Sequence, residues 1–232
     1  MPIGVFVDAG AVLCGALAGC ALGKWMPEKL RHELNILLGF CSISIGIVSI
    51  IKTSAMAPVV FAVLLGYVLG FALKLEERIT ALIGRLLERI PGAKRENFPM
   101  EQYITVIALF CASGFGIYGT FVEAMSGDHS ILLAKSALDM MTALIFAVNL
   151  RFAVTAVPAP MLASLLLMFC IGKCIAPFVM PEMLLNFTAC GGILTLAAGL
   201  RVSGIKIVAI MNMIPALLLV MPFTMLWQVL WA

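Results

Sequence analysis

Residues 126–151 read SGDHSILLAKSALDMMTALIFAVNLR. As a helix that begins near Asp128, this segment is long enough to cross a bilayer, because about 20 apolar residues suffice. It nevertheless carries Lys135 and Asp139, which lie one helical turn apart on the same face. At about 1.5 Å per residue, Asp139 lies roughly 15 Å along the helix, which predicts a position near the membrane midplane.

An ionisable pair at that depth is costly to desolvate, so it should face protein or a water-filled cavity rather than lipid. Two interpretations stay open for Lys135 and Asp139. They form either a structural ion pair that joins this helix to its neighbours or a part of a pathway for a solute or an ion. We favour the pathway.

The composition around this segment is that of an integral membrane protein. The chain has 232 residues, of which 63% are hydrophobic and 12% are charged. A soluble domain has about 45–50% apolar and 25% charged residues. The net charge of +3 does not indicate a nucleic-acid partner, because the charges lie in loops, where they set the membrane topology.

The cysteines indicate neither a disulfide framework nor a metal site. All of them fall in apolar segments, their number is odd, and no histidine or carboxylate beside them completes a zinc set. We therefore expect no cofactor and no metal. They are Cys14, Cys20, Cys41, Cys111, Cys170, Cys174 and Cys190.

The predicted fold class is all-α, a polytopic membrane helix bundle. About eight spans are predicted, at roughly 3–23, 34–51, 57–74, 102–122, 128–151, 154–173, 182–200 and 206–230. Residues 75–90 have apolar positions at helical spacing and Glu and Arg on the opposite face, which predicts an amphipathic helix at the membrane surface. The predicted parts are 1–74, the cytoplasmic segment 75–100, the central spans 101–151, and 152–232.

Loop charges predict the orientation. Alternating spans place twelve basic residues on one side and only Lys52, Lys135 and Lys173 on the other side or within spans. By the positive-inside rule the first side is cytoplasmic, so both termini are predicted to be periplasmic. The twelve are Lys24, Lys29, Arg31, Lys74, Arg78, Arg85, Arg89, Lys94, Arg95, Arg151, Arg201 and Lys206.

Two parts of the chain resemble each other. Met26-Pro27-Glu28 matches Met180-Pro181-Glu182, and three glycines of the first part match three of the second at an offset of 153 residues. Equivalent spans are five places apart in the chain, an odd number, so the second copy would be inverted, as in many secondary transporters. Coincidence among glycine-rich apolar segments is the alternative. The glycine pairs are Gly19 with Gly172, Gly39 with Gly192, and Gly46 with Gly199.

In such folds the site lies at the midplane, where interrupted helices of the two repeats meet. We expect helix breaks at Gly39, Gly46, Gly191, Gly192 and Pro215. Each polar residue there, taken alone, is more often a link between helices than a ligand. The candidate substrate- or ion-binding residues are Lys135, Asp139, Ser42, Ser44, Asn186, Thr188 and Asn212.

Several other features have structural interpretations. Gly15, Gly19 and Gly23 form a small-residue face that lets another helix approach, either from this chain or from a second subunit of a homo-oligomer. Asp8 is expected to be solvated at the membrane interface, and a buried functional role is the less favoured alternative. Residues 123–129 are predicted to form a loop. The GxGxxG pattern at 114–119 lacks a preceding strand, so its glycines serve packing or distort a helix.

Three stretches resemble the YqgA/YdfK-like family of bacterial inner-membrane proteins, a domain-of-unknown-function family. They are GVFVDAGAVLCGALAG, SGDHSILLAKSALDMMTALIFA and GIKIVAIMNMIPALLL, and they lie near the start, in the middle and near the end of the chain. The resemblance covers nearly the whole chain and implies a location in the bacterial inner membrane. It brings no established activity.

The favoured function is therefore a secondary transporter of a small polar solute or ion, with Asp139 as the group that couples transport to protons or sodium. An ion channel is one alternative. A membrane assembly or stress protein that does not transport is another. We expect no enzyme, because His32 and His129 sit at span ends and no Ser–His pair or metal cluster is visible.

Overall fold

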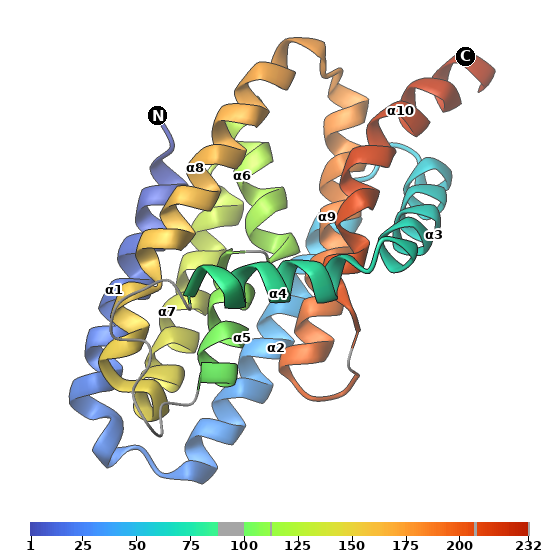
Figure 1. The fold of residues 1–232 in the computed structure, drawn as a ribbon. Coiled ribbons are helices and arrows are strands. Elements are labelled where there is room, and N and C mark those ends of the chain that lie inside the picture. Colours follow the sequence, from blue (N-terminus) through green and yellow to red (C-terminus); the bar gives the residue numbers. More distant parts are fainter. Residues whose placement is uncertain (88–99, 112, 207, 232) are drawn as a thin grey trace.

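The computed structural model describes residues 1–87, 100–111, 113–206 and 208–231 (Figure 1). Regular structure in these ranges is helical throughout. The helices are α1 (Ile3–Leu22), α2 (Glu28–Ile50), α3 (Met56–Ala72), α4 (Leu75–Leu87), α5 (Met100–Cys111), α6 (Gly114–Ser126), α7 (Ser130–Leu150), α8 (Pro158–Ile175), α9 (Pro181–Val202) and α10 (Ile214–Trp231). Short 3₁₀ helices are η1 (Gly23–Trp25), η2 (Arg151–Ala156), η3 (Ala176–Phe178) and η4 (Ile210–Met213).

The helices confirm the all-α class and support a membrane bundle. Six helical segments of the described residues are long and apolar enough to cross a bilayer, and the count rises to 7 if α3 and α4 form one span bent by 58°. The predicted fourth span differs from expectation. It consists of α5 and α6, with 12 and 13 residues, and each is shorter than the roughly 20 residues that a span needs.

Local chemistry explains where α6 and α7 begin and end. The Ser113 hydroxyl accepts a hydrogen bond from the Gly116 N–H and so caps α6, which ends at Gly127 with φ 78°. Residues 123–126 are thus helical rather than the predicted loop. The Ser130 N–H donates to Asp128 Oδ1 over 2.9 Å at the start of α7, and this backbone bond holds the pKa of Asp128 below its usual value.

Close helix contacts are built on glycines. A Cβ atom at Gly15 would lie 2.0 Å from Met140 O, and one at Gly19 would lie 2.3 Å from Leu144 O. The small-residue face of α1 therefore packs against α7 of the same chain. Glycine lets the two backbones come this close because it has no Cβ.

A second crossing joins α2 to α9. Cβ atoms at Gly39 and Gly199 would lie 2.7 and 2.6 Å from each other's carbonyl oxygens, and both distances are 2.7 Å for Gly46 and Gly192. Both helices run unbroken through these residues and through Gly191. The expected breaks are absent there, because the glycines serve close approach instead. Pro215 stands at the second position of α10, directly after η4.

The remaining layout separates the bundle into two packed regions. One apolar core lies mainly among α1, α5, α7 and α8, and the other among α3, α6, α9 and α10. The amphipathic helix α4 runs across the other helices in Figure 1. The rest of the predicted segment 75–100, from residue 88 to 99, lies outside the described residues.

Candidate functional site

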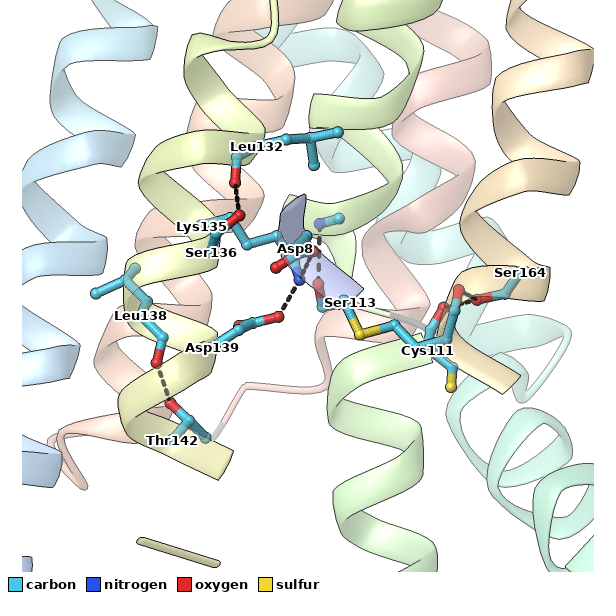
Figure 2. A network of polar contacts seen from close by, with 12 residues as sticks. Asp8, Cys111, Ser113, Leu132, Lys135, Ser136, Leu138, Asp139, Thr142 and Ser164 are labelled. Carbon is cyan, nitrogen blue, oxygen red and sulfur yellow. Dashed lines mark hydrogen bonds and ion pairs between the residues drawn. The ribbon is translucent and has the colours of Figure 1, made fainter. Parts of the chain in front are cut away.

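Three charged side chains meet between α1 and α7 (Figure 2). The Lys135 ammonium donates to Asp8 Oδ2 over 2.7 Å and also to Asp139 Oδ2. The side chains of Lys135, Asp8 and Asp139 are 2%, 0% and 15% exposed. We call these three residues the charged trio. The sequence favoured an Asp8 side chain solvated at the membrane interface. The structure instead buries it.

The close packing of α1 on α7 explains why the trio forms. Asp8 lies two helical turns before Gly15 on the face of α1 that contacts α7. Lys135 and Asp139 lie one turn apart on α7. Because glycine brings the two helices together, the short Asp8 side chain reaches the Lys135 ammonium directly.

The interrupted span lies beside the trio. A Cβ at Gly116 would lie 3.1 Å from Lys135 Cε, so the first turn of α6 contacts the lysine side chain. At the end of α5 the Cys111 carbonyl accepts a bond from the Ser164 hydroxyl over 3.3 Å. Figure 2 shows Cys111, Ser113 and the trio around one region. Helix interruptions were expected in α2 and α9. The structure instead has one between α5 and α6.

Two further buried polar groups lie on the same face of α6. Glu123 is 2% exposed, and its Oε1 accepts a 2.7 Å bond from the Gly4 N–H at the start of α1. Thr120, one turn before it, is fully buried. Within the described residues, Glu123 Oε2, Thr120 Oγ1 and Asp8 Oδ1 are buried without a hydrogen-bond partner.

The other predicted ligands lie apart from the trio. Ser42 donates to the Thr195 carbonyl over 3.0 Å at the crossing of α2 and α9. Ser44 is exposed and bonds the Phe40 carbonyl of its own helix. Thr188 is buried within α9. The Ser42 hydrogen bond therefore links two helices, and the Ser44 hydrogen bond lies within one helix.

The two predicted asparagines form hydrogen bonds at or just before the start of a helix. Asn186 Oδ1 accepts bonds from Ser54 N and Ala55 N over 3.0 and 3.1 Å just before α3, and Asn186 Nδ2 donates to Thr224 Oγ1 over 3.1 Å. Asn212 Oδ1 accepts from the Glu76 N–H over 3.0 Å at the start of α4. The Asn212 amide satisfies an N–H group that the start of α4 leaves unpaired, and the Asn186 amide holds the two residues that precede α3.

Sequence reasoning found Lys135 and Asp139, gave Asp8 a buried functional role only as the less favoured alternative, and missed Thr120 and Glu123. Asp8 is 127 positions from Lys135, so local spacing does not reveal the contact. A signal for α6 was available, because Ser113, Gly116, Thr120 and Glu123 repeat at helical spacing. They form one polar face in an otherwise apolar segment.

Comparisons with known proteins agree with this picture of a membrane protein. The family described as "Protein of unknown function (DUF554)" matches residues 3–225. "Uncharacterized protein YqgA" of Escherichia coli (strain K12) is 39% identical over 231 residues, which is 98% of each chain. "Uncharacterized membrane protein YdfK" of Bacillus subtilis (strain 168) is 25% identical over 220 residues, 93% of each chain. No solved structure gives a significant match.

Proposed function

We propose that this chain, which belongs to the DUF554 family of proteins of unknown function, is a secondary transporter for a small polar solute or ion. The observation that carries the proposal is the charged trio, which is buried among apolar helices beside the interruption between α5 and α6. Ionisable residues at membrane depth are rare and mark substrate and ion pathways. Irregular backbone at that depth is tolerated where it is buried in protein or lines a cavity.

The proposed architecture is a pair of inverted three-helix repeats, α1–α3 and α8–α10. Element boundaries support it at an offset of 153 residues. Added to Gly23–Trp25 of η1, this offset gives Ala176–Phe178 of η3, and added to Glu28 it gives Pro181, the first residue of α9. The links between the paired helices therefore have the same form in both repeats.

Backbone angles support the same offset. Met26 has φ −90° and ψ 109°, and Val179 has φ −95° and ψ 119°. The following residues, Pro27 and Met180, have φ/ψ of −65°/148° and −79°/157°. The Met-Pro-Glu motifs themselves match at 154, one residue away from the alignment that the backbone supports.

The crossing of α2 and α9 has the symmetry that such repeats require. At this offset, Gly39 is equivalent to Gly192 and Gly46 is equivalent to Gly199. A two-fold relation between the repeats therefore requires that a contact between Gly39 and Gly199 be accompanied by one between Gly46 and Gly192. Both contacts are present, with matching approach distances of 2.6–2.7 Å. Figure 1 draws α1 and α8 in opposite directions, and likewise α2 and α9.

We further propose eight spans, with α5 and α6 together forming one, and a position in the bacterial inner membrane with periplasmic termini. Figure 1 places both termini at the same end of the molecule, as an even number of spans requires. The C-terminal ends of α7 and α9, where Arg151 and Arg201 lie, are at the end of the molecule away from the two termini (Figure 1). Basic residues there favour a cytoplasmic location for that end.

A thermal-shift screen of the detergent-purified protein against small anions, amino acids and cations tests the proposal. A ligand at about 100 times its dissociation constant adds roughly 2.7 kcal/mol to the stability of the folded state. We expect a reproducible shift that is lost in Asp139→Asn and kept in Glu182→Gln, which changes an exposed carboxylate of α9. A flat screen at several pH values and salts would favour an assembly protein in which the trio only joins helices.

A further inference from the structure

The charged trio contains two carboxylates and one ammonium. Asp8 and Lys135 are almost fully buried, and Asp139 is 15% exposed. If all three are ionised, the trio carries one uncompensated negative charge in a medium of low dielectric constant, which is strongly unfavourable. Something must neutralise this charge, at least for part of the time.

The surrounding elements provide no second fixed cation among the described residues that face the trio. Cys111 of α5 brings only a thiol to this region (Figure 2). Ser113, Ser136 and Ser164, from the α6 start, α7 and α8, bring only hydroxyls. The N-terminus of α6 supplies at most about half a positive charge, and the Ser113 hydroxyl already accepts from one of its N–H groups.

Glu123 differs from the trio in its surroundings. Its Oε1 accepts a hydrogen bond from the Gly4 N–H at the start of α1, whereas Asp8 and Asp139 accept from the Lys135 ammonium. Glu123 is thus a buried carboxyl group that does not share the ammonium of the trio, and it serves as an internal comparison for Asp8 and Asp139.

The position of the lysine decides between a metal cation and a proton. Its ammonium donates to Oδ2 of both aspartates, so it already occupies the point between them. A sodium ion at the same carboxylates would lie close to this ammonium and would be repelled by it. A proton needs no coordination shell, and it can bind to an oxygen that the lysine leaves free, such as Asp8 Oδ1, which is buried without a partner.

We propose that the charged trio is a binding site for one proton, shared between Asp8 and Asp139, and that the proton is the coupling ion of the transporter. The inference rests on the proposed function, since it names that function's coupling ion. Uptake converts one carboxylate to a carboxylic acid and neutralises the trio; release returns the proton to water at Asp139, the partly exposed member. Two carboxylates on one ammonium titrate as a unit, so the proton belongs to the pair.

Infrared difference spectroscopy of the purified, lipid-reconstituted protein tests the site without a known solute. We expect the wild-type protein at neutral pH to show a carboxylic-acid C=O stretch that shifts in D₂O. Asp139→Asn and Asp8→Asn should each abolish this band, because the remaining aspartate and Lys135 then balance. Glu123→Gln, which removes a buried carboxyl group outside the trio, should leave the band unchanged.

Lys135→Met should change the carboxylic-acid band in the opposite direction from the two Asn variants. Without the ammonium, both aspartates must be neutralised, so the band should roughly double in area. This variant and the titration of the wild-type band with pH keep the test decisive if either Asn variant does not fold. An absent wild-type band, or one removed by Glu123→Gln alone, would overturn the inference.

Binding of radioactive ²²Na⁺ separates the two ions. We expect no ²²Na⁺ binding that depends on Asp139. Saturable ²²Na⁺ binding that is lost in Asp139→Asn would mean that the trio binds sodium instead of a proton. The outcomes remain distinguishable from those of the ligand screen. A flat screen with the infrared band present contradicts transport and keeps the proton site, whereas a ligand-dependent shift without the band contradicts only the proton site.

Discussion

Lys135 shows how much a single buried residue depends on its partners. Its side chain is 2% exposed, and its long aliphatic part passes the first turn of α6 before the ammonium reaches Asp8 and Asp139. The desolvation of an ammonium costs several kcal/mol, and close carboxylates must offset this cost. Removing the lysine leaves two carboxyl groups with no cation between them, whereas replacing all three residues leaves an uncharged contact.

We therefore predict that Lys135→Met destabilises the folded protein by about 3–5 kcal/mol, the usual cost of removing one partner of a buried ion pair. The measurement is thermal or chemical unfolding in detergent. Adding Asp8→Asn and Asp139→Asn to this variant should recover most of the loss. Lys173→Met, at an exposed lysine of α8 whose ammonium lies 5.6 Å from the Phe169 ring centroid, is the matched control and should change stability by at most about 1 kcal/mol. Equal losses in both lysine variants would mean that the trio does not contribute.

At the scale of elements, the crossing glycines set how closely the helices approach. Gly46 faces the backbone of α9, and a Cβ there would lie 2.7 Å from Gly192 O and 2.8 Å from Leu196 N. Backbone atoms cannot move aside as a side chain tip can, so the two helices would have to separate. Gly10 in α1 is also helical but has nothing within 4 Å of a built Cβ.

Gly46→Ala is accordingly predicted to destabilise the protein by about 1–3 kcal/mol, the range for overpacking a close contact. Gly10→Ala makes the same chemical change where space is open, and alanine favours a helix over glycine by up to about 1 kcal/mol. We expect Gly10→Ala to be neutral or stabilising. The paired measurement is the midpoint of thermal unfolding, and a loss of the same size at both positions would show that close approach is not what Gly46 provides.

The second prediction for the helices concerns the hydrogen bonds that Asn186 makes just before α3. Asn186 bonds the Ser54 and Ala55 N–H groups just before α3, so Asn186→Ala leaves these part-buried donors without their partner, at a cost of about 0.5–1.5 kcal/mol per hydrogen bond. Ser44→Ala removes an exposed hydroxyl that bonds within α2 and should be nearly neutral. If Asn186 instead belongs to the binding site, its variant should lose the ligand-dependent shift of the screen while keeping its stability without ligand.

The sequence predicted helices well because apolar runs and their Pro, Gly and Ser boundaries act locally, as at Pro27 and Gly127. It predicted Lys135 with Asp139 because both lie on one helix. It did not predict Asp8 as their partner, since that contact depends on how α1 packs on α7. Gly39 and Gly192 were expected to break helices, but glycine also permits close packing, and only the neighbouring helix determines which of the two it does.

At the scale of the whole molecule, the proposed inverted repeats make a geometric claim about Trp25 and Phe178. The offset of 153 residues relates them, and each ends the short 3₁₀ helix between two long helices of its repeat. They are 86% and 78% exposed, so a cysteine at either position is accessible to reagents. Figure 1 places η1 and η3, the links that carry them, at opposite ends of the bundle. In a membrane, equivalent positions of inverted repeats must lie on opposite sides.

Trp25→Cys and Phe178→Cys, each compared with the parent chain to account for its native cysteines, can be labelled in cells with a membrane-impermeant maleimide. We expect Phe178→Cys to react in cells whose inner membrane is intact, because the positive-inside rule places its loop in the periplasm. Trp25→Cys, flanked by Lys24 and Lys29, should react only after that membrane is permeabilised. Reaction of both from the same side would mean that an even number of spans separates Trp25 from Phe178, and the repeats would then be parallel. Reaction in the reverse order would keep the inversion but turn the whole protein over, placing both termini and the basic loops on the sides opposite to those proposed.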